Sequence, residues 1–181
     1  QDAALGPAPD GRRQVVVATN LAGTRLTIAG GRVVVDSGLE RRQRFDPGSG
    51  MSRLETVAIS RASADQRRGR AGRTAPGVCY RLWSESAHAS LSAQAVPEIL
   101  EADLAPLALE LACWGASDPQ SLAWLDPPPL ATLTQAKELL HRLEAIDERG
   151  QATPSGRRMA SLGTHPRLAH MIERGAALGL T

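Results

Sequence analysis

The chain has 181 residues, of which 42% are hydrophobic and 3% aromatic, and it carries a formal net charge of +2. This composition excludes a wholly disordered chain, and the length allows one ordinary domain or two small ones. No apolar run approaches the roughly 20 residues that span a bilayer, and no signal peptide is evident. We therefore expect a soluble, cytoplasmic chain with no membrane partner.

The charge is divided unevenly along the chain. Residues 1–81 carry fourteen arginines against seven acidic residues, whereas residues 82–181 carry seven basic and twelve acidic residues. The first part is therefore the better candidate for contact with a polyanion. Lys137 is the single lysine, so nearly all the cations are guanidinium groups, which bind phosphates through two parallel hydrogen bonds. A codon bias towards arginine would produce the same composition.

The first part of the chain has α/β order. Two β-branched runs, "VVVAT" (15–19) and "RVVVDSG" (32–38), predict buried strands of a parallel sheet. The sequence "DPGSG" (46–50) predicts a β-hairpin turn, because proline presets one backbone dihedral and glycine supplies a positive φ. A further strand is predicted at "GVCYRLW" (77–83).

The segment "SADQRRGRAGR" (63–73) concentrates positive charge. Ser63 predicts a helix N-cap, and on a helix through this segment Gln66, Arg70 and Arg73 share one narrow stripe. Its two glycines cost about 1 kcal/mol each inside a helix, which favours close approach of a ligand or another backbone. The alternatives are a solvated basic face and, for Gln66, a reciprocal capping bond to Ser63.

The second part predicts helices. Asp103 is expected to cap a helix with Pro106 in its first turn, and a second helix is expected at about residues 133–146. The segment 147–156 predicts a tight polar turn into a short extended segment, and this pattern resembles a winged helix. Further helices are expected to begin at Thr153-Pro154 and at His165-Pro166.

The remaining reactive side chains predict no metal site. The four histidines show no ligand pairing, and the two cysteines lack the spacing that metal or redox chemistry needs. We expect the cysteines and the three tryptophans to be structural.

Several motifs carry a family resemblance. The sequence "QRRGRAGR" (66–73) matches motif VI of superfamily-two helicases. The sequences "ATNLAGTRLTI" (18–28) and "VVVDSGLERRQRFDP" (33–47) resemble motif V and its continuation in DEAH-box RNA helicases. The later "WLDPPP" (124–129) and "TPSGRRMASLGTHPRLAHMI" (153–172) are similar to the bacterial HrpB-type members.

The resemblance implies three domains, in a fragment of a longer enzyme. Residues 1–84 would be the C-terminal part of a second RecA-like lobe, an α/β fold of the P-loop NTPase type. Residues 85–152 would form an all-α winged-helix domain, and residues 153–181 the beginning of a helical ratchet domain. The 181 residues contain neither a phosphate-binding G-x-x-x-x-G-K-[ST] loop nor an acidic Mg²⁺ motif, so we expect this segment alone to be inactive.

The resemblance also implies a nucleotide site. Arg70 and Arg73 would be arginine fingers for ATP, which would be bound with Mg²⁺ mainly by a first lobe; such a finger contributes roughly 10³ to 10⁵ in rate. Gln66 would touch the γ-phosphate or the attacking water, and Thr27 would face the nucleotide.

RNA contacts are implied for motif V and for the hairpin, whose arginines would meet phosphates without reading sequence. The alternatives are threonines that only cap a helix and an edge hairpin kept soluble by charge. The implied RNA-binding residues are Thr19, Asn20, Thr24, Arg25, Arg41, Arg42, Arg44 and Arg53.

Motif V departs from the family pattern at three positions. Gly23, Thr24 and Arg25 stand where the family usually has Glu-Thr-Ser, and Ala29 replaces an acidic residue near the nucleotide ribose. The first hypothesis is nevertheless an ATP-dependent RNA helicase, with DNA as an open second substrate. A non-catalytic nucleic-acid-binding module and a scaffold that binds neither ligand remain as alternatives.

Overall fold

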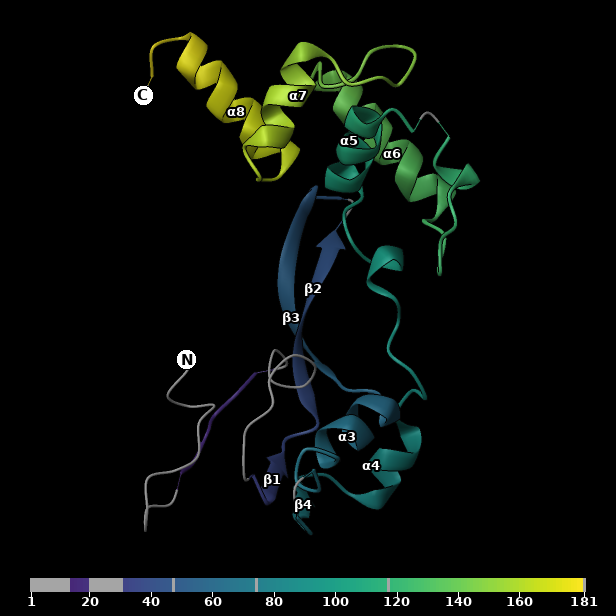
Figure 1. Cartoon of the computed structure of the whole chain (residues 1–181), viewed down its shortest axis with the longest axis vertical. Helices are drawn as coiled ribbons and strands as arrows, with labels where there is room; N and C mark the ends of the chain where they lie inside the picture. The colour runs from purple at the N-terminus through teal and green to yellow at the C-terminus, as the bar shows by residue number, and fades with distance from the viewer. Residues whose placement is uncertain (1–13, 20–30, 47, 74, 117, 181) are drawn as a thin grey trace. The chain divides into compact units, whose positions relative to one another are not determined.

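The computed structural model describes residues 14–19, 31–46, 48–73, 75–116 and 118–180 (Figure 1). The chain divides into two compact units. The first unit comprises residues 1–46 and 53–96, and the second comprises residues 47–52 and 97–181. Each unit is described by itself below.

A parallel strand pair forms the sheet of the first unit. Strand β1 (Val33–Asp36) pairs with β4 (Val78–Arg81), and Asp36 lies opposite Arg81. Helix α3 (Arg61–Arg68) packs against β1. The parallel pairing confirms the predicted α/β order. However, Val33 and Val35 are 60% and 64% exposed, so the prediction of a fully buried strand is wrong: α3 covers one face of β1 and leaves these two valines open.

The strand predicted at residues 15–19 does not form. These residues have no strand assignment, and Val15 and Val17 are almost fully exposed. A strand needs a hydrogen-bonded neighbour, and in the described part of the chain β1 pairs with β4 alone. Residues 15–19 are apolar enough for a strand, but in the described part of the chain no strand pairs with them.

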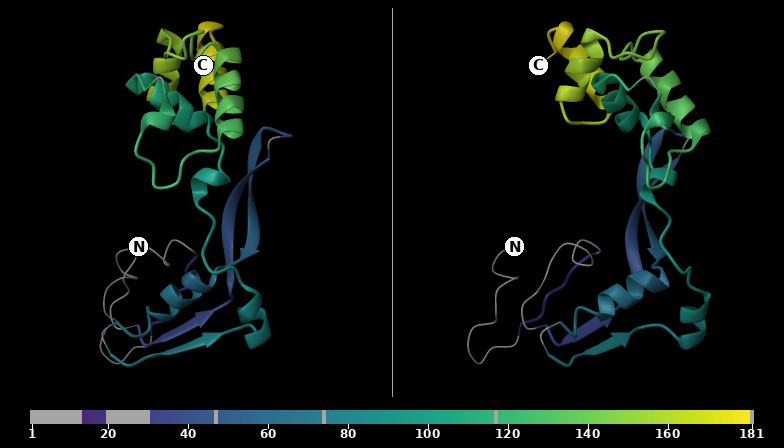
Figure 2. Two further views of the ribbon diagram at one scale, coloured as in Figure 1. Left: turned by 90° about the vertical axis from the view of Figure 1, so that its right-hand side faces the viewer. Right: turned by 45° about the vertical axis from the view of Figure 1, so that its right-hand side comes forward.

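The predicted hairpin is confirmed. Strands β2 (Leu39–Asp46) and β3 (Met51–Ala58) pair with each other and form a long twisted ribbon (Figure 2). Gly50, in the turn, has a φ of +65°, the left-handed conformation that favours glycine.

Helix α3 is shorter than the sequence predicts. Its N-cap is Ser60, whose hydroxyl accepts the N–H of Ser63 at 3.1 Å, so Ser63 is not the cap. The helix ends at Arg68, and the amides of Arg70 and Ala71 then bond to carbonyls three residues earlier. Glycine has low helix propensity, and two glycines in this segment favour the tighter turn. We call residues 69–73 the arginine turn.

The arginine turn is closed against the start of β4. A Cβ added at Gly77 would lie 2.0 Å from the carbonyl oxygen of Ala71 and 2.6 Å from that of Arg32, so only glycine fits there. A short helix that the sequence did not predict, α4 (Glu85–Ser90), follows β4 and is capped by the hydroxyl of Ser84.

The second unit is a helical bundle, which agrees with the predicted winged-helix pattern. Its helices are α5 (Ala105–Trp114), α6 (Leu130–Arg142), α7 (Pro154–Ser161) and α8 (Pro166–Ala177), with short 3₁₀ turns η1 (Glu98–Leu100) and η2 (Pro119–Ser121). The core is aliphatic and contains, among others, Leu104, Leu109, Leu133, Leu140, Ile146 and Met159. Lys137, the single lysine, lies half-buried on α6.

The predicted helix starts at Thr153 and His165 and the polar turn are confirmed. The N-cap of α5 is Leu104 rather than the predicted Asp103, and α6 begins and ends earlier than the predicted range of about 133–146. The Asp103 carboxylate accepts the N–H of Ala105 at 2.8 Å, and the Thr153 hydroxyl accepts the N–H of Gly156 at 3.0 Å. After α6, Asp147 accepts two amides of the turn, and Ile146 and Ala152 form an antiparallel bridge. None of the helices in the described part of the chain is long and apolar enough to cross a membrane.

His165 joins the starts of two helices. Its Nδ1 accepts the N–H of Arg167 at 3.2 Å, so the ring proton is on Nε2, which donates to Asp103 Oδ2 at 2.8 Å. Burial raises the pKa of Asp103, but the hydrogen bonds from His165 and from the Ala105 amide outweigh burial, and the net pKa lies below its usual 3.8. His165 is therefore structural, as predicted.

We expect Gly156→Ala to unfold or strongly destabilise the second unit, because the new Cβ would lie 2.0 Å from the carbonyl oxygen of Ala145. The expected loss is about 3 kcal/mol or more in the free energy of unfolding, measured by urea denaturation. The control is Gly175→Ala on α8, where the nearest outside atom is 3.6 Å away. That change should be neutral or stabilise by roughly 0.5–1 kcal/mol. Equal effects of the two substitutions would contradict this account.

We expect Asp103→Asn to cost about 1 kcal/mol at neutral pH, since a lowered pKa means that ionised Asp103 stabilises the native state. That contribution is complete above the ordinary pKa of 3.8 and is lost as the pH falls through the lower native pKa. Urea denaturation between pH 7 and pH 3 measures it. The difference in stability between the unmutated chain and the Asp103→Asn variant should shrink towards the acid end; a constant difference would show that the carboxylate charge is not responsible.

Candidate functional site

The candidate site is a cleft of about 430 Å³ in the first unit. It lies between β1, the base of β2, residues 14–19 and the arginine turn. Its polar lining includes Gln14, Thr19, Asp36, Arg41, Arg67, Arg70 and Arg73. Four of these residues, Thr19, Arg41, Arg70 and Arg73, are predicted site residues that the fold brings to one cavity.

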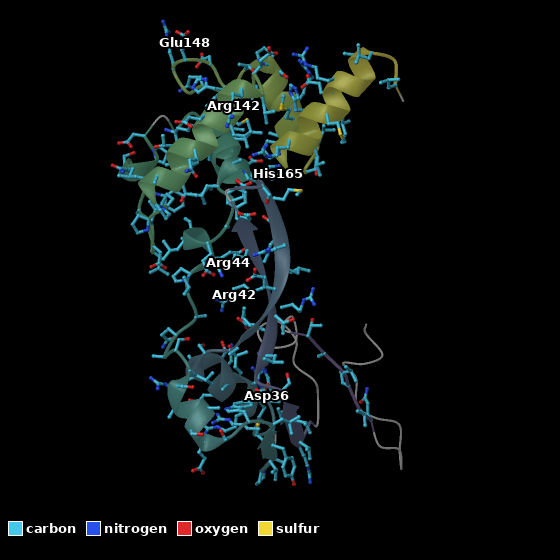
Figure 3. All side chains as sticks on the ribbon, turned by 180° about the vertical axis from the view of Figure 1, so that it is seen from behind. Asp36, Arg42, Arg44, Arg142, Glu148 and His165 are labelled. Carbon is cyan, nitrogen blue, oxygen red and sulfur yellow. The ribbon has the colours of Figure 1, made fainter. Side chains whose placement is uncertain are left out.

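Asp36 anchors the cleft wall. It is the last residue of β1 and is 4% exposed, and its Oδ1 accepts hydrogen bonds from the Gly38 amide at 3.0 Å and from Arg67 Nη1 at 2.9 Å (Figure 3). Burying a carboxylate is costly unless it is paired and hydrogen-bonded, and Arg67 supplies the opposite charge. Arg67 also donates to the Leu39 carbonyl at 3.1 Å, so this one side chain ties α3 to β1 and to the start of β2.

Arg70 and Arg73 lie three and six residues after Arg67 in the sequence. Burial lowers the pKa of the Arg70 guanidinium, and the positive charge of Arg73 lowers it further. Both effects mean that the charge of Arg70 is less favourable here than in water. Guanidinium groups form charge-assisted hydrogen bonds to phosphate, so the two residues are chemically suited to a phosphate group.

Gln66 is separate from this pair. It is exposed on α3 and is absent from the described lining of the cleft. The single helical stripe predicted for Gln66, Arg70 and Arg73 is therefore wrong, because α3 ends at Arg68 and the two arginines lie beyond it. Four predicted site residues, Asn20, Thr24, Arg25 and Thr27, lie outside the described residues, as do Gly23 and Ala29.

The hairpin arginines are largely paired with acids of the same hairpin. Arg42 Nη2 lies 2.6 Å from Glu40, whereas Arg44 and Arg53 share Glu55 at 3.6 and 2.8 Å. Arg44 and Arg53 remain 65% and 71% exposed, so phosphates can still reach them. Figure 3 labels Arg42 and Arg44 along β2. The hairpin is thus a surface of salt-bridged arginines.

Sequence reasoning missed Asp36 and Arg67. Asp36 ends an apolar run, and a carboxylate at the carboxyl end of a predicted parallel strand was an available signal. Arg67 lies within α3, and its pairing with Asp36 depends on how the helix packs against β1.

A second group of charged side chains connects the end of β4 to α3. Arg81 pairs with Asp65 at 2.8 Å and lies 5.7 Å from the centre of the Trp83 ring, which stacks with His88. The hydrogen bond from Arg81 lowers the pKa of Asp65. A Cβ at Gly38 would lie 2.7 Å from the Trp83 ring, so Trp83 is a packing residue, as predicted.

Comparison with known proteins identifies similar chains. The family described as "Helicase associated domain (HA2), winged-helix" matches residues 138–163, which run from α6 through the turn into α7. The chain is 49% identical to the ATP-dependent RNA helicase HrpB of Escherichia coli over 172 residues, which cover 95% of this chain and 21% of that protein.

Two eukaryotic proteins are also similar. They are the pre-mRNA-splicing factor ATP-dependent RNA helicase prp22 of Schizosaccharomyces pombe, 44% identical over 96% of this chain, and the probable ATP-dependent RNA helicase DHX34 of Mus musculus, 39% identical over 99%. The chain spans 15% and 16% of these two proteins, and thus about a fifth or less of each curated relative.

Two crystal structures of the Escherichia coli protein, titled as a DExH-box NTPase and as a DEAH/RHA helicase, are similar in fold. Their TM-scores are 0.79 and 0.85 at 48% identity, over 94% of this chain and 21% and 22% of theirs. The predicted fold class, a partial α/β lobe followed by a winged helix and a helical bundle, is thereby confirmed.

We expect Arg67→Ala to destabilise the first unit by about 3 kcal/mol, because it leaves the Asp36 charge buried without its partner. The matched control is the next residue: Arg68 is 62% exposed and only 3.6 Å from Asp65, so Arg68→Ala should cost about 0.5 kcal/mol or less. Chemical denaturation of the two variants measures both values. A similar small loss for both would show that the buried pair does not hold α3 to β1.

Proposed function

We propose that this chain, which is homologous to one segment of the HrpB-type DEAH-box RNA helicases, supplies the arginine-finger side of the ATPase site of an ATP-dependent RNA helicase. The observation that carries the proposal is the position of Arg70 and Arg73 in the lining of one cleft, where the positive charge of Arg73 helps to lower the pKa of Arg70. In this role the two guanidiniums neutralise the charge that develops on the transferred γ-phosphoryl group.

The nucleotide is proposed to be ATP with Mg²⁺, held mainly by a first lobe outside these residues. Arg70 and Arg73 bind its phosphates, and Thr27 faces the nucleotide. A contact of Gln66 with the γ-phosphate or the attacking water remains part of the proposal. Its exposed position on α3 leaves the amide accessible to a ligand.

The RNA-binding role is proposed for motif V and for the hairpin. Arg41 lines the cleft, and the exposure of Arg44 and Arg53 supports contact with phosphates. Such contacts are independent of sequence and weaken steeply with salt. The remaining proposed contacts are Thr19, Asn20, Thr24, Arg25 and Arg42.

The domain division is proposed as residues 1–84, 85–152 and 153–181, for the RecA-like part, the winged helix and the start of the ratchet domain. The helicase is proposed to act in the cytoplasm, on RNA. ATP hydrolysis would drive its movement along the strand.

The proposal is tested in the intact protein by Arg70→Ala and Arg73→Ala. We expect each to lower RNA-stimulated ATP hydrolysis by about 10³-fold or more, since each removes transition-state charge compensation. Phosphate release in the presence of a single-stranded RNA oligonucleotide is the measurement.

The matched control is Arg68→Ala, which removes an exposed arginine of the same segment and should preserve the rate. Unchanged hydrolysis in both cleft variants would sink the arginine-finger role. RNA binding without hydrolysis by the unmutated protein would instead favour a non-catalytic nucleic-acid-binding module.

A further inference from the structure

We infer that Glu40 is a positioning residue that couples the β2–β3 hairpin to the arginine turn. The coupling runs through four charged side chains in line: Arg42 on the hairpin, Glu40 at its base, Arg67 on α3 and Asp36 at the end of β1. The inference rests on the proposed function, because it concerns how RNA bound at the hairpin changes hydrolysis at the cleft.

Glu40 stands between two arginines that belong to different elements. Its Oε1 lies 2.6 Å from Arg42 Nη2, and its Oε2 lies 3.8 Å from Arg67 Nη2. The Glu40 side chain is 14% exposed and that of Arg67 is 17% exposed. Solvent ions screen such pairs much less than they screen surface pairs, so a change in one pair is felt in the other.

RNA bound at the hairpin would compete with Glu40 for the Arg42 guanidinium. A phosphate that binds Arg42 takes the guanidinium that now neutralises Glu40. A largely buried carboxylate that loses its partner is costly, and Arg67 is the remaining cation beside it. Glu40 and Arg67 are therefore expected to close from 3.8 Å to direct hydrogen-bond distance.

At the other end of this series of charged side chains, Asp36 offers two carboxylate oxygens as acceptors for Arg67. Asp36 Oδ1 accepts from Arg67, whereas Asp36 Oδ2 is buried and has no hydrogen-bond partner among the described residues. When Arg67 shifts towards Glu40, the second oxygen can accept its guanidinium, so the buried charge stays paired. This second oxygen is the acceptor that the proposed alternative arrangement of Arg67 would use.

The backbone of Arg67 carries the shift to the cleft. Its carbonyl oxygen accepts the N–H of Arg70 at 3.0 Å, which is one of the backbone bonds of the arginine turn. Arg70 and Arg73 line the cleft together with Glu40 and Arg67, so we expect a movement of Arg67 to change where the guanidiniums of Arg70 and Arg73 point. Hairpin occupancy would in this way adjust the arginine fingers.

The test compares Glu40→Gln with Glu55→Gln in the intact protein. Glu55 is the matched control, because it pairs with two arginines of the same hairpin, and in the described structure no ion pair joins it to α3. The readout is the ratio of ATP hydrolysis rates with and without saturating oligouridylate RNA. We expect Glu40→Gln to lower this ratio at least about fivefold, the lower end of typical allosteric coupling, and Glu55→Gln to change it less than about twofold.

Equal effects of the two substitutions, or no effect of either, would overturn the inference. If Glu40→Gln fails to fold, Glu40→Asp replaces it, since the shorter side chain keeps the charge but cannot reach both arginines.

A second readout does not depend on hydrolysis. Hydrogen exchange of the amides of Gly69, Arg70 and Ala71 is measured with and without the same RNA. We expect the RNA to change their exchange in the unmutated and Glu55→Gln proteins but not in Glu40→Gln.

The two readouts separate the inference from the proposed function. If the unmutated protein binds RNA without hydrolysing ATP, the proposed function is wrong and the exchange result alone decides the coupling. RNA binding that leaves these amides unchanged in the unmutated protein, or no RNA binding at all, would refute the coupling.

Discussion

The ion pair between Asp36 and Arg67 is the constraint on which the first unit depends. Asp36 is buried at the end of β1, and Arg67 reaches it from the last turn of α3 while also holding the Leu39 carbonyl. The Arg67 guanidinium therefore joins α3 to β1 and to the start of β2. The helix ends one residue later, so this contact lies directly before the arginine turn.

The two units are stabilised in different ways. The second unit has a continuous aliphatic core, and polar contacts such as His165 with Asp103, or Glu173 with Ser155 and Arg158, lock the helix ends around it. The first unit has two parallel strands with an open valine face, and ion pairs hold its elements in place. This difference matches the charge division of the sequence, in which the arginines concentrate in the first part.

Local signals in the sequence predicted most elements, and long-range contacts explain the failures. Caps and turns such as Thr153, His165 and Gly50 act within a few residues, so their predictions were confirmed. The run at 15–19 failed because pairing is a property of a neighbouring strand. The motif VI resemblance indicated Arg70 and Arg73, although the helical stripe was wrong. Ser60 in place of Ser63 as the cap is a local difference, whereas the partners of Arg67 depend on how β1 and the start of β2 approach the helix.

The near absence of lysine has a practical consequence. Within these residues Lys137, half-buried on α6, is the single side-chain amine, so amine-directed reagents have one side-chain target in the chain and none in the first unit. A dye or cross-linker attached there would report on the helical bundle and leave every guanidinium of the cleft and hairpin chemically intact. Acetylation of side-chain amines is likewise confined to that one position, so it cannot change the charge of the cleft or the hairpin.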